Sequence, residues 1–197
     1  LNADRLFRWK HNLGGYNRYA PIGAYDHQYT FFIDDDILPD RKCLEVFLDT
    51  ALKLNNEFGV LGQYGRLISS DNKYVAQDVI QGREIKEVDF IVQAYFVKTS
   101  YLHSILKFRW EIGYFDDRTP HDDLLLGASM KFYHDLRCYI LPSYHDKETD
   151  LRRNVLNDDF GHCTLPDHYQ LRQRFIDRIL FYGWKPLHIT GEKVFIL

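Results

Sequence analysis

Short apolar runs and longer stretches with helical spacing alternate along the chain. The run Tyr29-Thr30-Phe31-Phe32-Ile33 has the β-branched and aromatic content of a buried strand. Beyond Pro39, apolar residues recur every three or four positions, which predicts a helix that buries Leu44, Phe47, Leu48, Ala51 and Leu54. These two segments give the sequence its basic unit, a strand followed by a helix.

The same criteria predict the remaining elements. Strands are expected at 6–9, 59–62, 88–97 and 137–141, and a hairpin at 66–70 and 73–79. Helices are expected at 16–25, 99–106, 122–133 and 169–182, with loops at 108–120 and 143–165. Neither a repeat nor a linker interrupts this order, so we expect one α/β domain, 1–197, with a mainly parallel central sheet flanked by helices.

The composition is that of a globular protein with a substantial core. Of the 197 residues, 45% are hydrophobic, and 14 Tyr and 14 Phe make the chain rich in aromatic side chains. The net charge of -3 provides no electrostatic basis for binding nucleic acid. The three cysteines, Cys43, Cys138 and Cys163, fit neither a zinc site nor a disulfide framework, so we expect reduced thiols.

The sequence contains no apolar run of transmembrane length and no signal peptide. We therefore expect a protein that is cytoplasmic or peripheral to a membrane. The chain begins at Leu1 without a Met, and its opening is similar to the middle of a domain. For this reason we expect a fragment of a longer protein.

Three consecutive aspartates, Asp34, Asp35 and Asp36, follow the first strand. Negative charges at the end of a buried strand are costly unless they are compensated, and a divalent cation would compensate them. Residues two apart on a strand share a face, so Asp34 and Asp36 could reach one ion while Asp35 faces elsewhere, for example a sugar hydroxyl. An acidic turn that caps the next helix is the alternative reading of these residues.

A second acidic cluster, His121-Asp122-Asp123, lies where a loop meets a helix. The helix dipole favours carboxylates at this position, and Asp122 would serve as an N-cap. Capping of the helix explains Asp122, but it explains less well why a second aspartate and a histidine lie on the same turn. The functional reading is a general base held on a rigid helix start, within reach of a substrate hydroxyl.

Two further segments are candidates for ligand binding. His145 follows the strand at 137–141, and imidazole would complete a carboxylate site for an ion such as Mn²⁺, although a lone His is commonly an ordinary surface or core residue. The turn at Gly14-Gly15 would let the backbone approach a nucleotide, with Arg18 on a phosphate or an acid. The alternative is a plain tight turn before a helix.

Taken together, these segments resemble the inverting glycosyltransferases of the GT-A fold, close to the large family 2 group. The resemblance covers residues 6 to about 146 and rests on four segments in a fixed order. The first is Arg8-Trp9-Lys10-His11-Asn12-Leu13-Gly14-Gly15-Tyr16-Asn17-Arg18, similar to the family's N-x-G-G-x-x-R stretch, and the second is Phe31-Phe32-Ile33-Asp34-Asp35-Asp36, similar to its strand and DxD metal motif. The third is Asp122-Asp123-Leu124-Leu125-Leu126, similar to its helix start with the catalytic base, and the fourth is Tyr139-Ile140-Leu141-Pro142 followed by His145, similar to its closing strand and metal-binding His.

The resemblance implies a metal-dependent transfer of a sugar from a nucleotide-diphosphate donor, most simply a UDP-sugar, to a hydroxyl of a glycan, glycoprotein or lipid, with inversion. Mn²⁺ or Mg²⁺ is expected on Asp34, Asp36 and His145. The motif register favours Asp123 over Asp122 as the base. Donor contacts are expected from Asp34, Asp35, Gly14, Arg18 and Arg66, with support from basic residues in 147–153 and a lid at 143–165.

The chain also departs from the family pattern. Nothing in it matches the amino-terminal strand-helix-strand unit that holds the uracil and ribose of the donor in the family. Two alternatives therefore stay open: a non-catalytic carbohydrate- or partner-binding domain with a degenerate transferase fold, and a metal-dependent nucleotidyltransferase. The second should carry a phosphate-binding Gly/Lys loop, which the sequence lacks.

Overall fold

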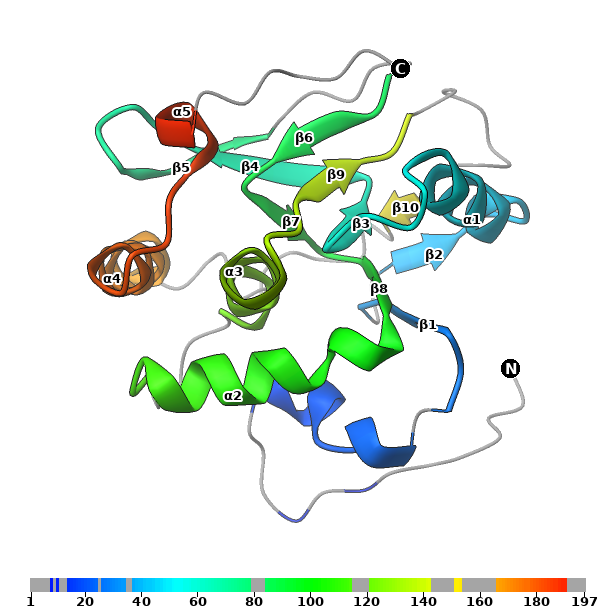
Figure 1. Ribbon diagram of the computed structural model, residues 1–197, viewed down its shortest axis with the longest axis horizontal. Coiled ribbons are helices and arrows are strands. Elements are labelled where there is room, and N and C mark those ends of the chain that lie inside the picture. The colour runs from blue at the N-terminus through cyan, green and yellow to red at the C-terminus, as the bar shows by residue number, and fades with distance from the viewer. Residues whose placement is uncertain are drawn as a thin grey trace.

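The computed structural model describes residues 8, 10, 14–24, 26–34, 37–78, 84–114, 121–142, 151–153 and 166–190. The described chain is an α/β structure in which helices surround a central group of strands (Figure 1). This arrangement confirms the predicted class. The strand predicted at 6–9 lies almost entirely outside the described residues.

The main sheet has five strands in the order β1-β8-β3-β9-β6. They are β1 (Tyr29–Phe32), β8 (Tyr95–Lys98), β3 (Val60–Gly62), β9 (Cys138–Ile140) and β6 (Lys86–Val88). Among these five strands, β3 and β9 are the neighbours that run parallel, and the other pairs are antiparallel. The prediction of a mainly parallel sheet was therefore wrong: the sheet is mixed, because β8 enters between β1 and β3 from the opposite direction.

Strands β1, β3 and β9 nevertheless share one direction, since β1 and β3 both pair antiparallel with β8. Their carboxyl ends consequently meet at one edge of the sheet. Asp34 lies at this edge, just beyond the end of β1.

A second sheet of three strands contains the predicted hairpin. Its strands are β5 (Tyr74–Asp78), β4 (Tyr64–Ile68) and β7 (Phe90–Val92). The single strand predicted at 88–97 is in fact divided among β6, β7 and β8. Asp89 interrupts it because its buried carboxylate accepts hydrogen bonds from the amides of Ile68 and Leu187, and Gln93 interrupts it with a φ of 77°.

Residues beyond the acidic triplet form β2 (Ile37–Pro39), which pairs antiparallel with β10 (Leu151–Arg153). Pro39 therefore lies in a strand, and the next helix, α1 (Cys43–Lys53), begins later than predicted. Helix α1 buries Val46, Phe47 and Ala51, whereas Leu44 and Leu48 are exposed. The predicted apolar face was thus rotated by about one residue relative to the core.

The remaining helices are the 3₁₀ helices η1 (Gly14–Tyr19), η2 (Ile22–Ala24) and η3 (Thr99–Tyr101), and the α-helices α2 (His103–Glu111), α3 (Asp122–His134), α4 (His168–Phe181) and α5 (Leu187–Thr190). Among them, α3 and α4 match the predicted bounds within a residue, whereas the helix predicted at 99–106 is divided into η3 and α2 and continues to Glu111, into the predicted loop at 108–120, and α5 was not predicted. The helix predicted at 16–25 is divided into η1 and η2, with Pro21 between them. None of the helices in the described part of the chain is both long and apolar enough to span a membrane.

Helix α3 is the central helix of the structure. It packs against β7, β3 and α2, and it lies between α2 and the strands in Figure 1. Its first nine residues, 122–130, are all buried, which explains their nearly continuous apolar character apart from two aspartates. Burial of both aspartates at the start of this helix makes their compensation the main question about the site.

Candidate functional site

Arg18 joins two acidic segments that are far apart in the sequence. Its Nη2 donates to Oδ1 of Asp34 at 2.8 Å, and its Nε lies 3.3 Å from Oδ2 of Asp122. Asp34 follows β1 and Asp122 begins α3, so the guanidinium connects the carboxyl edge of the sheet to the central helix. Three of the four predicted motif segments therefore meet at one place.

The turn at η1 brings Arg18 to this position. Tyr16 and Tyr19 are buried and anchor the turn, while Gly15 lies directly against Asp122. A β-carbon at Gly15 would overlap the Asp122 carboxylate, so only glycine permits this approach. Gly14, predicted to contact a nucleotide, is the first residue of η1.

Asp122 is buried, and its surroundings leave it poorly compensated. Burial raises the pKa of Asp122 to about 6, Arg18 opposes the rise, and the neighbouring charges of Asp123 and Asp34 add to it. Its Oδ2 faces Arg18 and accepts no hydrogen bond from the described residues. A carboxylate with this pKa can gain and lose a proton near neutral pH.

Asp123, in contrast, is fully engaged. Its Oδ1 accepts a hydrogen bond from the amide of Leu124 at 2.8 Å, and its Oδ2 accepts one from Nη2 of Arg172 at 2.8 Å. Arg172 belongs to α4, and its Nη1 donates to the hydroxyl of Tyr74 at 2.8 Å. Asp123 is therefore held as an ion pair within the protein.

Sequence reasoning missed Arg172. A signal was present, because Arg172 lies four residues after His168 and four before Ile176, on the face of α4 that is buried. A cation at a core position of an amphipathic helix requires an anionic partner. The sequence did not show which carboxylate this partner would be.

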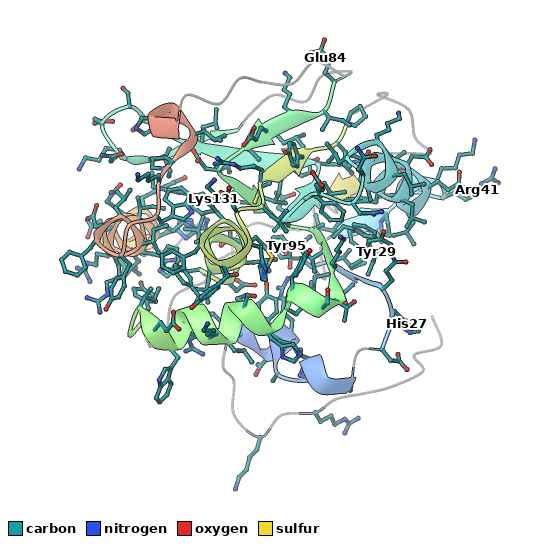
Figure 2. The ribbon with its side chains drawn as sticks, viewed as in Figure 1. His27, Tyr29, Arg41, Glu84, Tyr95 and Lys131 are labelled. Atoms are coloured by element: carbon teal, nitrogen blue, oxygen red, sulfur yellow. The ribbon has the colours of Figure 1, made fainter. Side chains whose placement is uncertain are left out.

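Three buried tyrosines, Tyr16, Tyr19 and Tyr95, interact electrostatically with the acidic pair. Burial raises the pKa of Tyr19 and Tyr95 well above the usual value, and the charge of Asp122 adds to each shift. Tyr95 comes from β8 and lies in the interior of the molecule (Figure 2), with the Arg18 guanidinium 5.5 Å from the centre of its ring. The phenols consequently stay protonated, which makes them neutral hydrogen-bond donors around Asp122.

His121, predicted as part of the acidic cluster, has a packing position. Its ring is fully buried, and its centre lies 5.5 Å from the ring of Tyr114 and 5.5 Å from that of Phe175. The predicted loop at 108–120 contains two further side chains, Trp110 and Glu111, which differ in their surroundings. Trp110 is 75% exposed on α2, whereas Glu111 accepts a hydrogen bond from Tyr133.

The remaining predicted site residues are placed as follows. Arg66 lies in β4, in register with Phe90 of β7 and Asp78 of β5. Asp35, Asp36 and His145 lie outside the described residues, so the three-residue metal site remains a prediction. Within the described ranges there is no group of three or more His, Cys, Asp or Glu side chains that could hold a metal ion.

One part of the segment at 143–165 is described, the strand β10. Its backbone pairs with β2 so that Arg153 is opposite Ile37, which follows the acidic triplet in the sequence. Part of the segment predicted to be basic is thus paired with the strand that follows the triplet.

A cavity of about 200 Å³ occurs elsewhere, at the amino end of β3. It is lined by the end of α1 and by residues of β6 and β9, including Lys53, Glu57, Glu87 and Tyr139. None of the predicted site residues lines it. Asp34, by comparison, has 28% of its side chain exposed, and it lies at the opposite end of the strands.

The carboxylates at the sheet edge are suited to a hard cation. Asp34 supplies a partly exposed oxygen donor of the kind that hard cations bind. In the structure its negative charge is compensated by the guanidinium of Arg18, 2.8 Å away. Chemically, the arrangement offers one carboxylate for an ion or ligand, one carboxylate with a raised pKa and a fixed guanidinium between them. Comparison with models of known protein families gives no match to the chain, and comparison with curated proteins gives none either.

Proposed function

We propose that the chain is the catalytic domain of a metal-dependent glycosyltransferase with a GT-A fold. The observation that carries this proposal is the Arg18 guanidinium, which contacts both Asp34 and Asp122. The sequence resemblance requires the segments of Arg18, Asp34 and Asp122 to form one site. If the two acidic segments were unrelated surface turns, they would not be expected to contact the same guanidinium. The α/β architecture and the common carboxyl edge of β1, β3 and β9 support the same proposal.

The donor side of the site lies at Asp34. Together with Asp36 and His145, this residue would hold Mn²⁺ or Mg²⁺, whose chemical contribution is to neutralise charge on the leaving nucleoside diphosphate. Arg18 would bind the donor diphosphate beside the ion. The pairing of β10 with β2 supports a further contribution from basic residues in 147–153, because β2 is the strand that follows the acidic triplet in the sequence.

We propose Asp122 rather than Asp123 as the general base. The motif register favoured Asp123, but both oxygens of Asp123 already accept hydrogen bonds, from Leu124 and Arg172. Asp122 has a pKa of about 6 because of burial, and its Oδ2 accepts no hydrogen bond from the described residues. At neutral pH it would take the proton of the acceptor hydroxyl during attack on the anomeric carbon from the face opposite the diphosphate.

The substrates are a nucleotide-sugar donor, most simply a UDP-sugar, and a glycan, glycoprotein or lipid hydroxyl. The alternative that deserves a direct test is a non-catalytic carbohydrate-binding domain with the same fold. It would need neither the raised pKa of Asp122 nor the tight approach of Gly15, and these two features favour catalysis. A nucleotidyltransferase remains the less favoured reading, for want of a Gly/Lys phosphate loop.

Calorimetric titration with a panel of nucleotide sugars, with and without Mn²⁺, tests the proposal. The variants are Asp34→Asn and, as a matched control, Asp49→Asn, which changes an exposed aspartate on α1. We expect one donor to bind only with Mn²⁺, and we expect this binding to be lost in Asp34→Asn and retained in Asp49→Asn. Binding of free glycans without any nucleotide sugar would instead establish the binding domain.

A further inference from the structure

Arg172 makes a contact that spans the fold. Its guanidinium comes from α4, 49 residues after Asp123 in the chain, and donates to Oδ2 of that residue at 2.8 Å. Both side chains are buried, with 9% of Arg172 and 4% of Asp123 exposed. An ion pair with so little solvent around it has a fixed geometry, because neither partner can be replaced by water without a large cost.

The guanidinium is itself anchored from the opposite side. Its Nη1 donates to the hydroxyl of Tyr74 at 2.8 Å. The next residue, Gln173, accepts a hydrogen bond from the amide of Tyr74 at 2.7 Å and donates to the carbonyl of Asn72 at 3.1 Å. Helix α4 is therefore attached to the β4–β5 hairpin at three points, and Arg172 cannot move independently of that hairpin.

These contacts continue into the first turn of α3. Asp123 accepts the amide hydrogen of Leu124 through Oδ1, while Leu125 donates its amide hydrogen to the carbonyl of His121 at 2.7 Å. Asp122 is adjacent to Asp123 on the same turn. The direction of the Asp122 carboxylate, towards Arg18, therefore depends on how firmly Asp123 is held.

We propose that Arg172 is a positioning residue for the acid–base group of the site. Anchored on Tyr74, it holds Asp123 and with it the first turn of α3, so that Asp122 faces Arg18 and the reacting hydroxyl. This role rests on the proposed function, in which Asp122 is the base. Arg172 bonds Asp123 and Tyr74, whereas Asp34 on the donor side bonds Arg18, so the proposal separates turnover from donor binding.

The test uses the whole chain and four variants. Arg172→Gln removes the charge, Arg172→Lys retains it with fewer donors, and Tyr74→Phe removes the anchor alone. Arg174→Gln is the control, since Arg174 lies on the same helix but is exposed. Three quantities are measured for each variant: amide hydrogen exchange at Leu124–Leu126, the dissociation constant for the donor found by titration with Mn²⁺, and the rate of metal-dependent donor hydrolysis.

We expect Arg172→Gln to accelerate exchange at Leu124–Leu126 and to lower the hydrolysis rate roughly 100-fold, because a small displacement of a reacting group has this effect. The donor dissociation constant should stay within about twofold of wild type, since Arg172 lies outside the donor side. Arg172→Lys and Tyr74→Phe should give smaller effects in the same direction.

The outcomes are distinguishable. Unchanged exchange at Leu124–Leu126 in Arg172→Gln overturns the positioning role whatever the activity. An active wild type with a hydrolysis rate in Arg172→Gln equal to that of Arg174→Gln overturns it while leaving the proposed function intact. A wild type that neither binds nor hydrolyses any donor overturns the proposed function, and the catalytic role of Arg172 fails with it.

Discussion

Gly15 packs so closely against Asp122 that its α-carbon has no room for a side chain. The contact joins the turn at η1 to the start of α3. In this contact the backbone of Gly15 takes the place of water beside the Asp122 carboxylate. The Asp122 carboxylate is consequently confined between Gly15 and the guanidinium of Arg18.

We expect Gly15→Ala to disturb both stability and activity. The new methyl group must push Asp122 away from Arg18, which should lower the free energy of unfolding by about 1–3 kcal/mol and abolish most donor turnover. Gly23→Ala is the matched control, because nothing lies within 4 Å of a β-carbon at that position. Equal urea midpoints for the two variants would contradict the close approach of Gly15.

Arg18 should be required for the stability of the uncomplexed protein as well as for catalysis. Replacing it by Met removes the cation that pairs with the buried Asp122, and we expect a loss of about 1–3 kcal/mol, below the range for fully buried pairs because 27% of Arg18 is exposed. Chemical denaturation at neutral pH measures this loss. Arg41→Met, an exposed substitution, serves as the reference.

Replacement of Asp122 by Asn should stabilise the protein and inactivate it. Since burial raises the folded-state pKa of Asp122 to about 6, from an ordinary value of 3.8, the ionised group disfavours folding at higher pH. The cost is absent below the unfolded-state pKa and is complete above the folded-state pKa. We therefore expect the free energy of unfolding of Asp122→Asn to exceed that of wild type by about 3 kcal/mol at pH 7.5.

This advantage should shrink to a small fraction near pH 4, where Asp122 is protonated in the folded chain and the unfolded-state group is close to its own pKa of 3.8. Urea denaturation of both proteins between pH 4 and pH 8 provides the measurement. Asp89, whose pKa burial also raises to about 6, is present in both proteins and cancels in the difference. A constant difference across this range would contradict the raised pKa of Asp122.

The two described cysteines should be unreactive in the folded state. Cys43 and Cys138 are buried, and burial raises the pKa of the Cys138 thiol well above its usual value. Iodoacetamide at pH 8 should therefore label neither residue in the native protein and both in urea. Mass spectrometry of the peptides identifies the labelled positions, and rapid native labelling of Cys138 would show that its surroundings open readily.

Local patterns predicted the elements well where one face of a segment decides its structure. The strand before Asp34 and the helix after His121 have the expected bounds within a residue or two, because burial of their apolar residues imposes the period. The division of 88–97 was not predictable in this way. It depends on Asp89, whose partners Ile68 and Leu187 are distant in the sequence.

The site shows the same limit. Asp34, Asp122 and Arg18 could be named from the sequence because each lies in a recognisable segment. Their direct contact through one guanidinium could not, since no local rule specifies partners 16 and 104 residues away from Arg18. Arg172 was missed for the same reason, and its partner Asp123 only became evident from the fold.

The distance between Arg172 and Asp123 along the chain also bears on how the protein is made. A ribosome completes the start of α3 well before it completes α4, so for that interval Asp123 has no cation to accompany it into the interior. A buried unpaired carboxylate is too costly to form, and the first turn of α3 must therefore stay hydrated until α4 docks. We therefore expect the two helices to fold together. A nascent chain interrupted between them would expose its acidic turn to solvent and to chaperones.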